Sequence, residues 1–398
     1  MMPDKKKKVL FLIEDGSFTF DNRVIREADA LQDDGWDVTV ICPKNRSDPY
    51  YRRQCENLRI YFYPKPEARS ALGHVIEHSI SIFAVSVLSW FVFLRHGFRV
   101  IHACNPMDIF WIPSLPFKLF GVRYIFDQHD LCPELYLSRD EGGEESLFFR
   151  LLSWLERKSF KFSDVVISTN ESYRRIAHDR GGKQDSDVFV VRNGPNLDKF
   201  KLVQPRNDLK DSGEILVGYL GNMNPQDGVD YLLRAAAELV KTREADNIRF
   251  VFVGGGSYRE ALEKMSVEMG LAPWVRFTGR IDDNEMLATL SACDVCVQPD
   301  PFNPLNDKST MNKVMEYMAL TKPVVAFDLT ETRVSCGNSA IYAKPNSEAD
   351  LADKILQVAE DPDLRARMGE SGRRRVEEQL AWSYSVPQLL AAYARASD

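Results

Sequence analysis

Short runs of apolar residues alternate with longer segments of helical periodicity along the whole chain. The runs are rich in β-branched and aromatic residues, which favours strands, and the segments between them have the spacing of amphipathic helices. In the first half, the predicted strands are residues 9–14, 37–43, 58–64, 99–105, 123–130, 164–170 and 187–194. Such alternation is typical of parallel sheets flanked by helices, so the sequence predicts an α/β fold.

The pattern is interrupted once and then resumes. Residues 195–214 are polar, contain proline and show no periodicity, as is common where domains are joined. A second series of predicted strands follows, at residues 215–221, 248–256, 275–280, 294–300, 322–328 and 340–345. We therefore predict two doubly wound, Rossmann-like domains, residues 1–195 and 214–382, with a linker at 196–213. A last helix, at about residues 383–398, is expected to pack back on the first domain.

Composition excludes several classes of protein. The 398 residues exceed what one hydrophobic core usually supports. Lys and Arg number 51 and Asp and Glu 58, a net charge of −7, so no general electrostatic attraction to nucleic acid is expected. Seven cysteines are dispersed and lie mostly within apolar runs, which indicates reduced thiols and a cytoplasmic protein. The basic N-terminus precedes only about five apolar residues, which predicts a first strand and not a secretion signal.

The most apolar segment, residues 79–94, has two interpretations. It carries four serines and is shorter than the roughly 20 residues of a membrane-spanning helix. Its aromatic residues, with Arg95 and His96 after it, suit a helix that lies on a membrane and reaches a lipid-linked sugar. A helix buried against the sheet explains the same residues. We expect peripheral contact with the inner face of a membrane or burial, and no crossing.

The candidate ligand site lies in residues 305–329. A predicted strand ends near Asp300, and after an irregular loop a helix is expected to begin near Thr310. In open parallel sheets, ligands bind beyond the carboxyl ends of the strands, where the first N–H groups of a helix are unpaired. Ser309 or Thr310 is expected to cap this helix, and the amides as far as Met311 can hold a phosphate.

Charged residues strengthen this interpretation. Lys308 and Lys313 supply countercharge for a phosphate. Glu316 follows Lys313 by three residues, on nearly the same helix face, and its carboxylate can accept hydrogen bonds from two ribose hydroxyls. The pattern fits a nucleoside diphosphate pocket. A Lys–Glu pair on a solvated helix surface explains the same spacing, and the residues alone do not decide between the two.

The chain resembles the retaining glycosyltransferases of family four, in particular the bacterial surface-polysaccharide type, over essentially its full length. The resemblance rests on "VGYLGNMNPQDGVDYLLRAAAEL", "FVFVGGGSYREAL", "VRFTGRIDDNEMLATLSACDVCVQPD" and "MEYMALTKPVVAFD", which occur in the family's order and spacing. It implies the GT-B fold, in which two Rossmann-like domains face a central cleft. It also implies transfer from a nucleoside diphosphate sugar, with retention and without a metal.

Two departures from the family pattern concern the donor site. Glu316 matches the second of two family glutamates, which holds the ribose, but Lys308 stands in place of the first, and Asp307 is the nearest carboxylate. The Arg and Lys that usually follow the first strand of the second domain are replaced by Asn222 and Asp227. The resemblance further implies that backbone groups near Arg280 hold the nucleobase. The predicted donor-binding residues are Asn193, Gly221, Asn222, Gly254, Arg280, Ile281, Lys308, Ser309, Thr310, Met311 and Glu316.

The first domain supplies the remaining candidates. His129 and Asp130 end a predicted strand. The resemblance implies that this His approaches the donor sugar and that the Asp orients an acceptor hydroxyl, and with Lys313 they form the predicted catalytic set. An alternative is that His129 only caps the strand end. On the acceptor side, Asp21 is expected to cap a helix and Arg23 to contact a phosphate or the acceptor.

We therefore expect a cytoplasmic glycosyltransferase that moves a sugar from a UDP-sugar to a glycan or lipid-linked acceptor, with no metal or other cofactor. A non-catalytic subunit that binds sugar nucleotides is one alternative, because Lys308 and Asp227 replace family residues. A UDP-sugar epimerase on the same fold is another.

Overall fold

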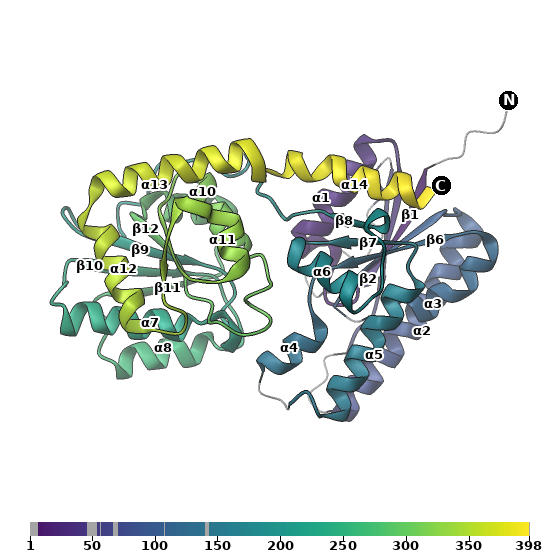
Figure 1. Cartoon of the computed structure of the whole chain (residues 1–398), viewed down its shortest axis with the longest axis horizontal. Coiled ribbons are helices and arrows are strands. Elements are labelled where there is room, and N and C mark those ends of the chain that lie inside the picture. The colour runs from purple at the N-terminus through teal and green to yellow at the C-terminus, as the bar shows by residue number, and fades with distance from the viewer. Residues whose placement is uncertain are drawn as a thin grey trace. The chain divides into compact units, whose positions relative to one another are not determined.

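The computed structural model describes residues 7–45, 54–55, 57–66, 71–106, 108–139 and 143–397. The chain divides into two compact units (Figure 1). Unit 1 comprises residues 1–192 and 385–398, and unit 2 comprises residues 193–384. Each unit is a largely parallel sheet flanked by helices. This confirms the predicted α/β fold with two Rossmann-like domains.

The sheet of unit 1 has the order β3-β4-β2-β1-β5-β6-β7-β8 within the described residues. All neighbouring strands are parallel except β3 and β4, which are antiparallel. The two-residue strand β3 was not predicted from the apolar pattern. The central strands are buried along nearly their whole length, so their sequences are continuous apolar runs. The strands are β1 (Lys8–Leu12), β2 (Asp37–Pro43), β3 (Gln54–Cys55), β4 (Leu58–Tyr63), β5 (Val100–Cys104), β6 (Arg123–Gln128), β7 (Val165–Ser168) and β8 (Val188–Val190).

Helices pack on both faces of this sheet. The first shows how the sequence specifies one: the side chain of Asp21 accepts hydrogen bonds from the N–H groups of Arg23 and Val24, both at 3.0 Å, and so caps α1 as predicted. The helices of unit 1 are α1 (Asn22–Asp33), α2 (Ala71–Arg95), α3 (Trp111–Ser114), the 3-10 helix η2 (Leu115–Phe120), α4 (Cys132–Ser138), α5 (Leu147–Phe162) and α6 (Glu171–Asp179).

The apolar segment forms part of α2, which is longer than the sequence suggested. By length and composition, Ile76–Arg95 is apolar enough to cross a bilayer, and 28% of it is buried in the protein. The buried side of α2 holds polar contacts: Ser81 and His78 bond to the carboxylate of Glu14, at 3.4 and 3.0 Å. The helix is therefore docked on unit 1, with a large part of its surface uncovered.

The last helix, α14 (Trp382–Ser397), belongs to unit 1 from Ser385 onward. The hydroxyl of Tyr393 lies 2.8 Å from Nδ1 of His102 on β5, and the Tyr393 ring packs edge-on against Trp36. Arg395 binds Asp187 at 2.8 Å. These contacts make the C-terminal residues a part of the first domain's core.

Unit 2 contains a parallel sheet of order β11-β10-β9-β12-β13-β14. Alternate residues of its strands feed two hydrophobic clusters, one on each face: Phe250 and Phe252 of β10 enter one, and Val251 and Val253 the other. The strands are β9 (Ile215–Leu220), β10 (Ile248–Val253), β11 (Val275–Gly279), β12 (Val295–Gln298), β13 (Val324–Phe327) and β14 (Ala340–Ala343). The helices are α7 (Val229–Ala237), α8 (Arg259–Glu268), α9 (Asp283–Ala292), α10 (Asn312–Ala319), α11 (Thr330–Cys336), α12 (Glu348–Glu360) and α13 (Pro362–Arg375).

Residues 196–213, which the sequence suggested as a linker, lie within unit 2. Phe200 and Leu209 are buried in one of its hydrophobic clusters. Arg206 binds Glu285 of α9 at 2.6 Å. The segment has no regular periodicity because it runs over the surface of unit 2, yet its apolar side chains fasten it there.

Candidate functional site

The carboxyl edge of the unit 2 sheet is built from loops that approach each other closely. A Cβ on Gly254, which follows β10 at φ +130°, would lie 1.9 Å from the carbonyl oxygen of Gly221, which follows β9. A Cβ on Gly256 would lie 2.3 Å from the carbonyl oxygen of Met223. Only glycine fits at such approaches. Gly221 and Gly254, both predicted donor-binding residues, are thus adjacent.

Helix α10 is fixed to this edge by Tyr317. Its buried hydroxyl accepts a hydrogen bond from the N–H of Leu220 at the end of β9, at 2.7 Å. Lys313, one helical turn earlier, reaches the same place: its Nζ lies 5.1 Å from the centre of the Tyr219 ring. Glu316 is half-buried on the same helix. The structure therefore brings together Lys313, Gly221 and Gly254, as the sequence predicts.

Lys313 has a partner that sequence analysis did not assign. Its Nζ lies 2.8 and 2.9 Å from the two oxygens of Asp300, a carboxylate that is 1% exposed and follows β12. Burial raises the pKa of nearby Asp227, against the opposing charge of Lys313. The ammonium group is thus held in one position by a buried charge, which fixes where it can meet an anion. The sequence signal that could have identified Asp300 as a site residue was its position after a predicted strand.

The start of α10 differs from the prediction. Met311, and neither Ser309 nor Thr310, is the cap residue, and it makes no side-chain capping bond. The Ser309 hydroxyl instead donates to the carbonyl of Leu305, at 2.8 Å, within the preceding turn. The helix begins two residues later than expected because this turn retains residues 305–309. Its first N–H groups therefore have no side-chain cap from Met311.

Asp307 also has a structural role. Its carboxylate accepts hydrogen bonds from the N–H and the hydroxyl of Thr330, at 2.8 and 3.0 Å, at the start of α11. It caps a different helix from the one that follows it in sequence. Asp307, the carboxylate nearest in sequence to the position of the absent family glutamate, is thus engaged in this cap. Lys308 stands at the position of that glutamate.

The remaining donor-site candidates lie in loops of unit 2. Arg280, exposed after β11, packs its side chain beside Gly255, where a Cβ would lie 3.4 Å from Cγ of Arg280. Ile281 is half-buried against a hydrophobic cluster. Asn222 supplies the carbonyl that accepts a hydrogen bond from the Tyr219 hydroxyl, at 2.5 Å. Asn193, the remaining predicted donor-binding residue, is the first residue of unit 2.

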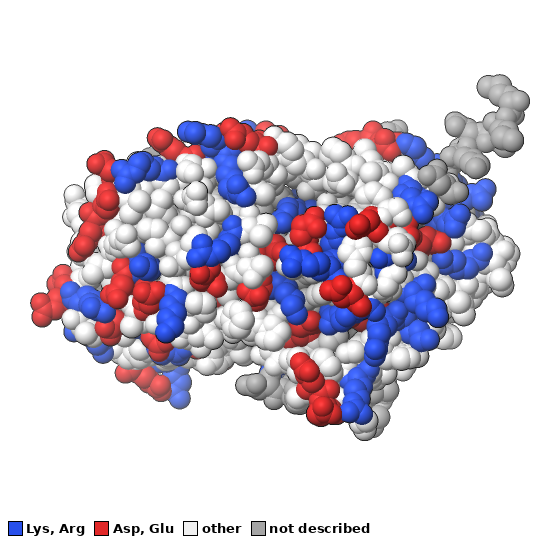
Figure 2. Space-filling model, viewed as in Figure 1, with Lys and Arg blue, Asp and Glu red and all other residues white. Residues whose placement is uncertain are grey.

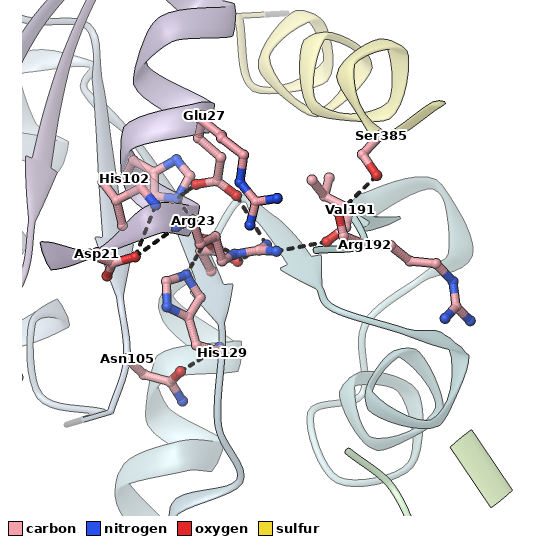
Figure 3. Close-up of polar contacts among 12 residues, drawn as sticks. Asp21, Arg23, Glu27, His102, Asn105, His129, Val191, Arg192 and Ser385 are labelled. Atoms are coloured by element: carbon pink, nitrogen blue, oxygen red, sulfur yellow. Dashed lines mark hydrogen bonds and ion pairs between the residues drawn. The ribbon is translucent and has the colours of Figure 1, made fainter. Parts of the chain in front are cut away.

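Unit 1 contains a buried cluster of charged and polar side chains around Asp127 of β6 (Figure 3). Arg23 donates to both oxygens of this carboxylate, from Nε at 3.2 Å and from Nη2 at 2.8 Å. It also donates to the carbonyl of Val191, at 2.8 Å. Arg23 is 5% exposed. The prediction that it contacts a phosphate or the acceptor is therefore corrected: its donors serve the interior of unit 1.

His129 is held at the edge of this cluster. Its Nε2 donates to Oδ2 of Asp127, at 2.5 Å, and the N–H groups of His129 and Asp130 both donate to Oδ1 of Asn105, at 2.5 and 3.0 Å. Asn105 follows β5, so two strand ends fix the loop. The side chain of His129 is 14% exposed, and its ring bonds to the carboxylate of Asp127. His129 therefore does more than cap the end of a strand. Neither Asp127 nor Asn105 was predicted.

The charges of the cluster determine its protonation. Burial would raise the pKa of Asp127, but the charges of Arg23 and His129 outweigh it and hold this pKa well below 3.8. Burial would lower the pKa of His129, but the charge of Asp127 and the hydrogen bond raise it above 6.5. Burial lowers the pKa of His102, which stays neutral, donates from Nε2 to Asp127 and accepts from Tyr393. His129 therefore retains positive charge to a higher pH than an ordinary histidine.

Glu27 of α1 is the other buried carboxyl of the cluster. Burial raises its pKa to about 8, against the opposing charge of Arg23, whose Nη2 lies 3.1 Å from Oε1. Neither oxygen has a hydrogen bond of good geometry from the described residues. Between pH 4.5 and 8 the native state thus binds more protons at Glu27 than the unfolded state, and its contribution to stability falls as pH rises through this window.

Replacing Glu27 with glutamine tests this protonation. Glu27→Gln should raise the free energy of unfolding above that of the wild type at pH 6 and further above it at pH 9, because the wild type loses stability as the pH rises from 4.5 to about 8. Asp127→Asn is the matched control in the same cluster and should destabilise at both pH values. Unfolding followed by circular dichroism at the two pH values measures the difference in the transition that belongs to unit 1, because the two domains need not unfold together. An equal loss for Glu27→Gln at pH 6 and pH 9 would show that Glu27 is ionised in the native protein.

Two groups of metal-ligating type occur among the described residues: His102, Cys104 and Asp127, and Glu27, Asp127 and His129. Both share Asp127, whose two oxygens already receive the Arg23 guanidinium. A cation would compete there with a buried positive charge. The cluster therefore fits an internal ion-pair network better than a metal centre.

Comparison with known proteins matches each domain to a glycosyltransferase family. The family described as Glycosyltransferase Family 4 matches residues 21–199, and the family described as Glycosyl transferases group 1 matches residues 214–361. The chain is 29% identical to alpha-D-kanosaminyltransferase of Streptomyces kanamyceticus, over 71% of this chain and 72% of that protein. It is 25% identical to D-inositol 3-phosphate glycosyltransferase of Stackebrandtia nassauensis, over 94% of this chain and 86% of that protein.

Solved structures show the same fold. Sucrose-phosphate synthase from Thermosynechococcus elongatus superposes with a TM-score of 0.79 at 18% identity, covering 98% of each chain. HepE of Anabaena in complex with UDP-glucose gives a TM-score of 0.71 at 17% identity, over 97% of this chain and 99% of that one. These likenesses confirm the GT-B arrangement of two Rossmann-like domains.

Proposed function

Since each domain matches a glycosyltransferase family and the fold is GT-B, we propose that the chain transfers a sugar from a UDP-sugar to a glycan or lipid-linked acceptor, with retention at the anomeric carbon. The observation that carries the proposal is the carboxyl edge of unit 2, where Lys313, Gly221 and Gly254 meet at the start of α10. A nucleoside diphosphate needs a cation, backbone N–H groups and close approach to the chain, and this edge offers all three.

The donor would be held by residues of unit 2. Glu316 accepts hydrogen bonds from the ribose hydroxyls, and backbone groups at Arg280 and Ile281 hold the base. Lys313, Lys308 and the amides that begin α10 bind the diphosphate. Uridine is the proposed base because HepE of Anabaena, with the same fold, binds UDP and UDP-glucose. A plant starch synthase of this fold binds ADP, so nucleotide selectivity is part of the test.

The chemistry follows from the charge that develops as the sugar leaves. The diphosphate gains negative charge, and donors already fixed in position stabilise it at little reorganisation cost. Asp300 holds Lys313 in place for this purpose. We propose that these groups balance the charge without a metal, and that the acceptor attacks from the face that the diphosphate leaves. His129 would contact the donor sugar, with Asp130 orienting the acceptor hydroxyl.

Glu316→Ala tests the donor site. It should weaken UDP binding more than tenfold, because the ribose hydroxyls lose their acceptor. The measurement is the melting temperature of the protein against UDP concentration in the presence of a chelator, since a ligand of the native state raises it. Glu360→Ala, at the exposed end of α12, is the control and should bind as the wild type does. Unchanged UDP affinity in Glu316→Ala would remove Glu316 from the site.

A non-catalytic subunit is the second candidate, favoured by one observation. Asp307, the carboxylate nearest to the absent family glutamate, caps α11 and therefore does not replace it. Such a subunit would bind UDP-sugar without turning it over. Release of UDP from UDP-sugar in the presence of cell-membrane acceptors distinguishes the two functions, and a UDP-sugar epimerase would instead convert the donor without any acceptor.

We further propose that the protein acts in the cytoplasm at the inner face of a membrane, where a lipid-linked acceptor is presented. The apolar helix α2 supports this location, because much of it is uncovered.

A further inference from the structure

Helix α2 has large apolar side chains on its exposed side, while its buried side combines Val85 and Val92 with polar residues. Six large apolar side chains recur at helical spacing along its outer side, and Phe83 and Leu94 are 70% and 79% exposed. The opposite side is buried and carries Glu77, Ser81 and Ser89. A helix on the surface of a water-soluble domain has the reverse pattern. The outward residues are Ile76, Ile80, Phe83, Val87, Phe91 and Leu94.

Two neighbouring elements extend this face. Helix α3 contacts both α2 and α5, and Figure 1 shows the three along one side of unit 1. In α3 and η2, the exposed apolar residues are Ile112, Leu115, Leu119 and Phe120. In α5, they are Leu147, Phe148, Leu151 and Trp154. We call these residues, with the six of α2, the apolar surface. Exposed apolar residues gathered on neighbouring helices mark sites that a membrane or another protein covers.

The helices that carry the apolar surface expose ionised side chains of one sign, and the exposed acids Glu144 and Glu145 lie just before α5. In the described parts of α2, α3, η2 and α5, both acidic residues, Glu77 and Glu156, are buried. Every ionised side chain that these helices expose is basic, and Lys and Arg gather over α3 and α5 in Figure 2. Two of them also meet acids outside the helices, Lys118 with Asp164 and Arg150 with Glu145. The basic residues are Arg95, Lys118, Arg150, Arg157, Lys158 and Lys161.

We propose that the apolar surface docks unit 1 on a bilayer that contains anionic lipids, with the three helices lying in the interface. The outer side of α2 from Ile76 to Leu94 is about 27 Å long, at 1.5 Å per residue. Exposed Phe and Trp side chains among basic ones suit the boundary between acyl chains and anionic headgroups. This proposal rests on the function proposed above in one respect: a lipid-linked acceptor would explain why the enzyme docks on a membrane.

The contacts of α2 favour lying on the membrane over crossing it. Crossing would expose Glu77, Ser81 and Ser89 to the acyl chains and break the bonds of Ser81 and His78 to Glu14. Each unpaired polar group in the hydrocarbon costs several kcal/mol. In the docked arrangement these groups stay within unit 1, and only the outward residues enter the lipid.

The test is co-sedimentation of the full chain with vesicles of phosphatidylcholine alone or mixed with phosphatidylglycerol. The wild type should bind the mixed vesicles more tightly, and added salt should weaken this binding. The triple variant Phe83→Ser, Leu94→Ser and Leu119→Ser should lose at least tenfold in affinity. Arg157→Glu with Lys161→Glu should lose the preference for phosphatidylglycerol. The controls are Val267→Ser and Lys264→Glu on α8 of unit 2, where one exposed apolar and one exposed basic residue are changed.

Each outcome decides the proposal. Absence of vesicle binding by the wild type, or equal binding by the triple variant, overturns it. A wild type that self-associates in sedimentation velocity and a triple variant that is monomeric would assign the apolar surface to a second copy of the chain, which also overturns it. The UDP-dependent melting shift is measured on every variant: a normal shift shows folded protein and leaves the donor site standing whatever the vesicles show.

Discussion

Replacing His129 with alanine is expected to lower the turnover number of sugar transfer about 100-fold or more, the range found when a positioned acid, base or polar group is removed. The proposal places this imidazole against the donor sugar. The structure adds a reason for its effect, since Nε2 is committed to Asp127 and the loop is fastened by Asn105. Turnover is measured as UDP release with acceptor present, and UDP affinity, set by unit 2, should change little.

Two comparisons make this prediction specific. His178→Ala, at a half-buried histidine of α6, should leave turnover unchanged. If the positive charge of His129 is used, activity falls as pH rises through its pKa, and Asp127→Asn should move that fall to lower pH because the carboxylate raises this pKa. Full activity in His129→Ala would restrict the residue to a structural part. An unmoved pH profile in Asp127→Asn would separate the carboxylate from the titrating group.

Replacing Arg23 with methionine should destabilise unit 1 by about 3–5 kcal/mol, as expected when one partner of a buried ion pair is removed. Asp127 would keep its burial and lose its strongest donor, and the carbonyl of Val191 would lose its hydrogen bond. Because the chain has two domains, global unfolding is not a single transition. Hydrogen exchange of the amides of β1 and β6 measures the stability of unit 1 alone.

A matched variant on the same helix isolates the buried charge. Arg26→Met removes a partly exposed arginine of α1, whose Nε donates to the carbonyl of Asn22, and should change stability by less than about 0.5 kcal/mol. The double variant Arg23→Met with Asp127→Asn should recover part of the loss, because no ionised carboxylate then remains unpaired. Equal and small losses for Arg23→Met and Arg26→Met would mean that the network around Asp127 contributes little to stability.

The positions of most strands along the chain could be predicted because they follow from local sequence, whereas β3 and the order of the strands in each sheet were not predicted. Buried parallel strands such as β10 need continuous apolar residues, and turn residues separate them from helices. The strand ends also located His129 and the region of Lys313 correctly on carboxyl edges. Capping of α1 by Asp21 is equally local, since donor and acceptor lie within three residues.

What could not be predicted depends on residues distant in the sequence. Arg23 and Asp127 are 104 positions apart, so the sequence near Arg23 could not show that its charge is consumed in the interior. Asp307 and Thr330 are 23 positions apart, and their bond decides that Asp307 is a cap. Helix α2 shows another limit: its sequence is largely apolar, and only packing reveals that Ser81 and Ser89 face the protein while Phe83 and Leu94 do not.

The return of α14 to unit 1 has a consequence during synthesis. Residues up to Arg192 leave the ribosome first and contain the whole sheet of unit 1. The last helix that covers this sheet joins unit 1 at Ser385, 193 residues later (385 − 192). At about 5–20 residues per second, this gap lasts roughly 10–40 s. Throughout it, His102 has no Tyr393 hydroxyl, and Trp36 lacks the ring that packs on it. The first domain to emerge is thus the last to be completed, and the nascent chain presents chaperones with an uncovered binding surface while the second domain is still being made.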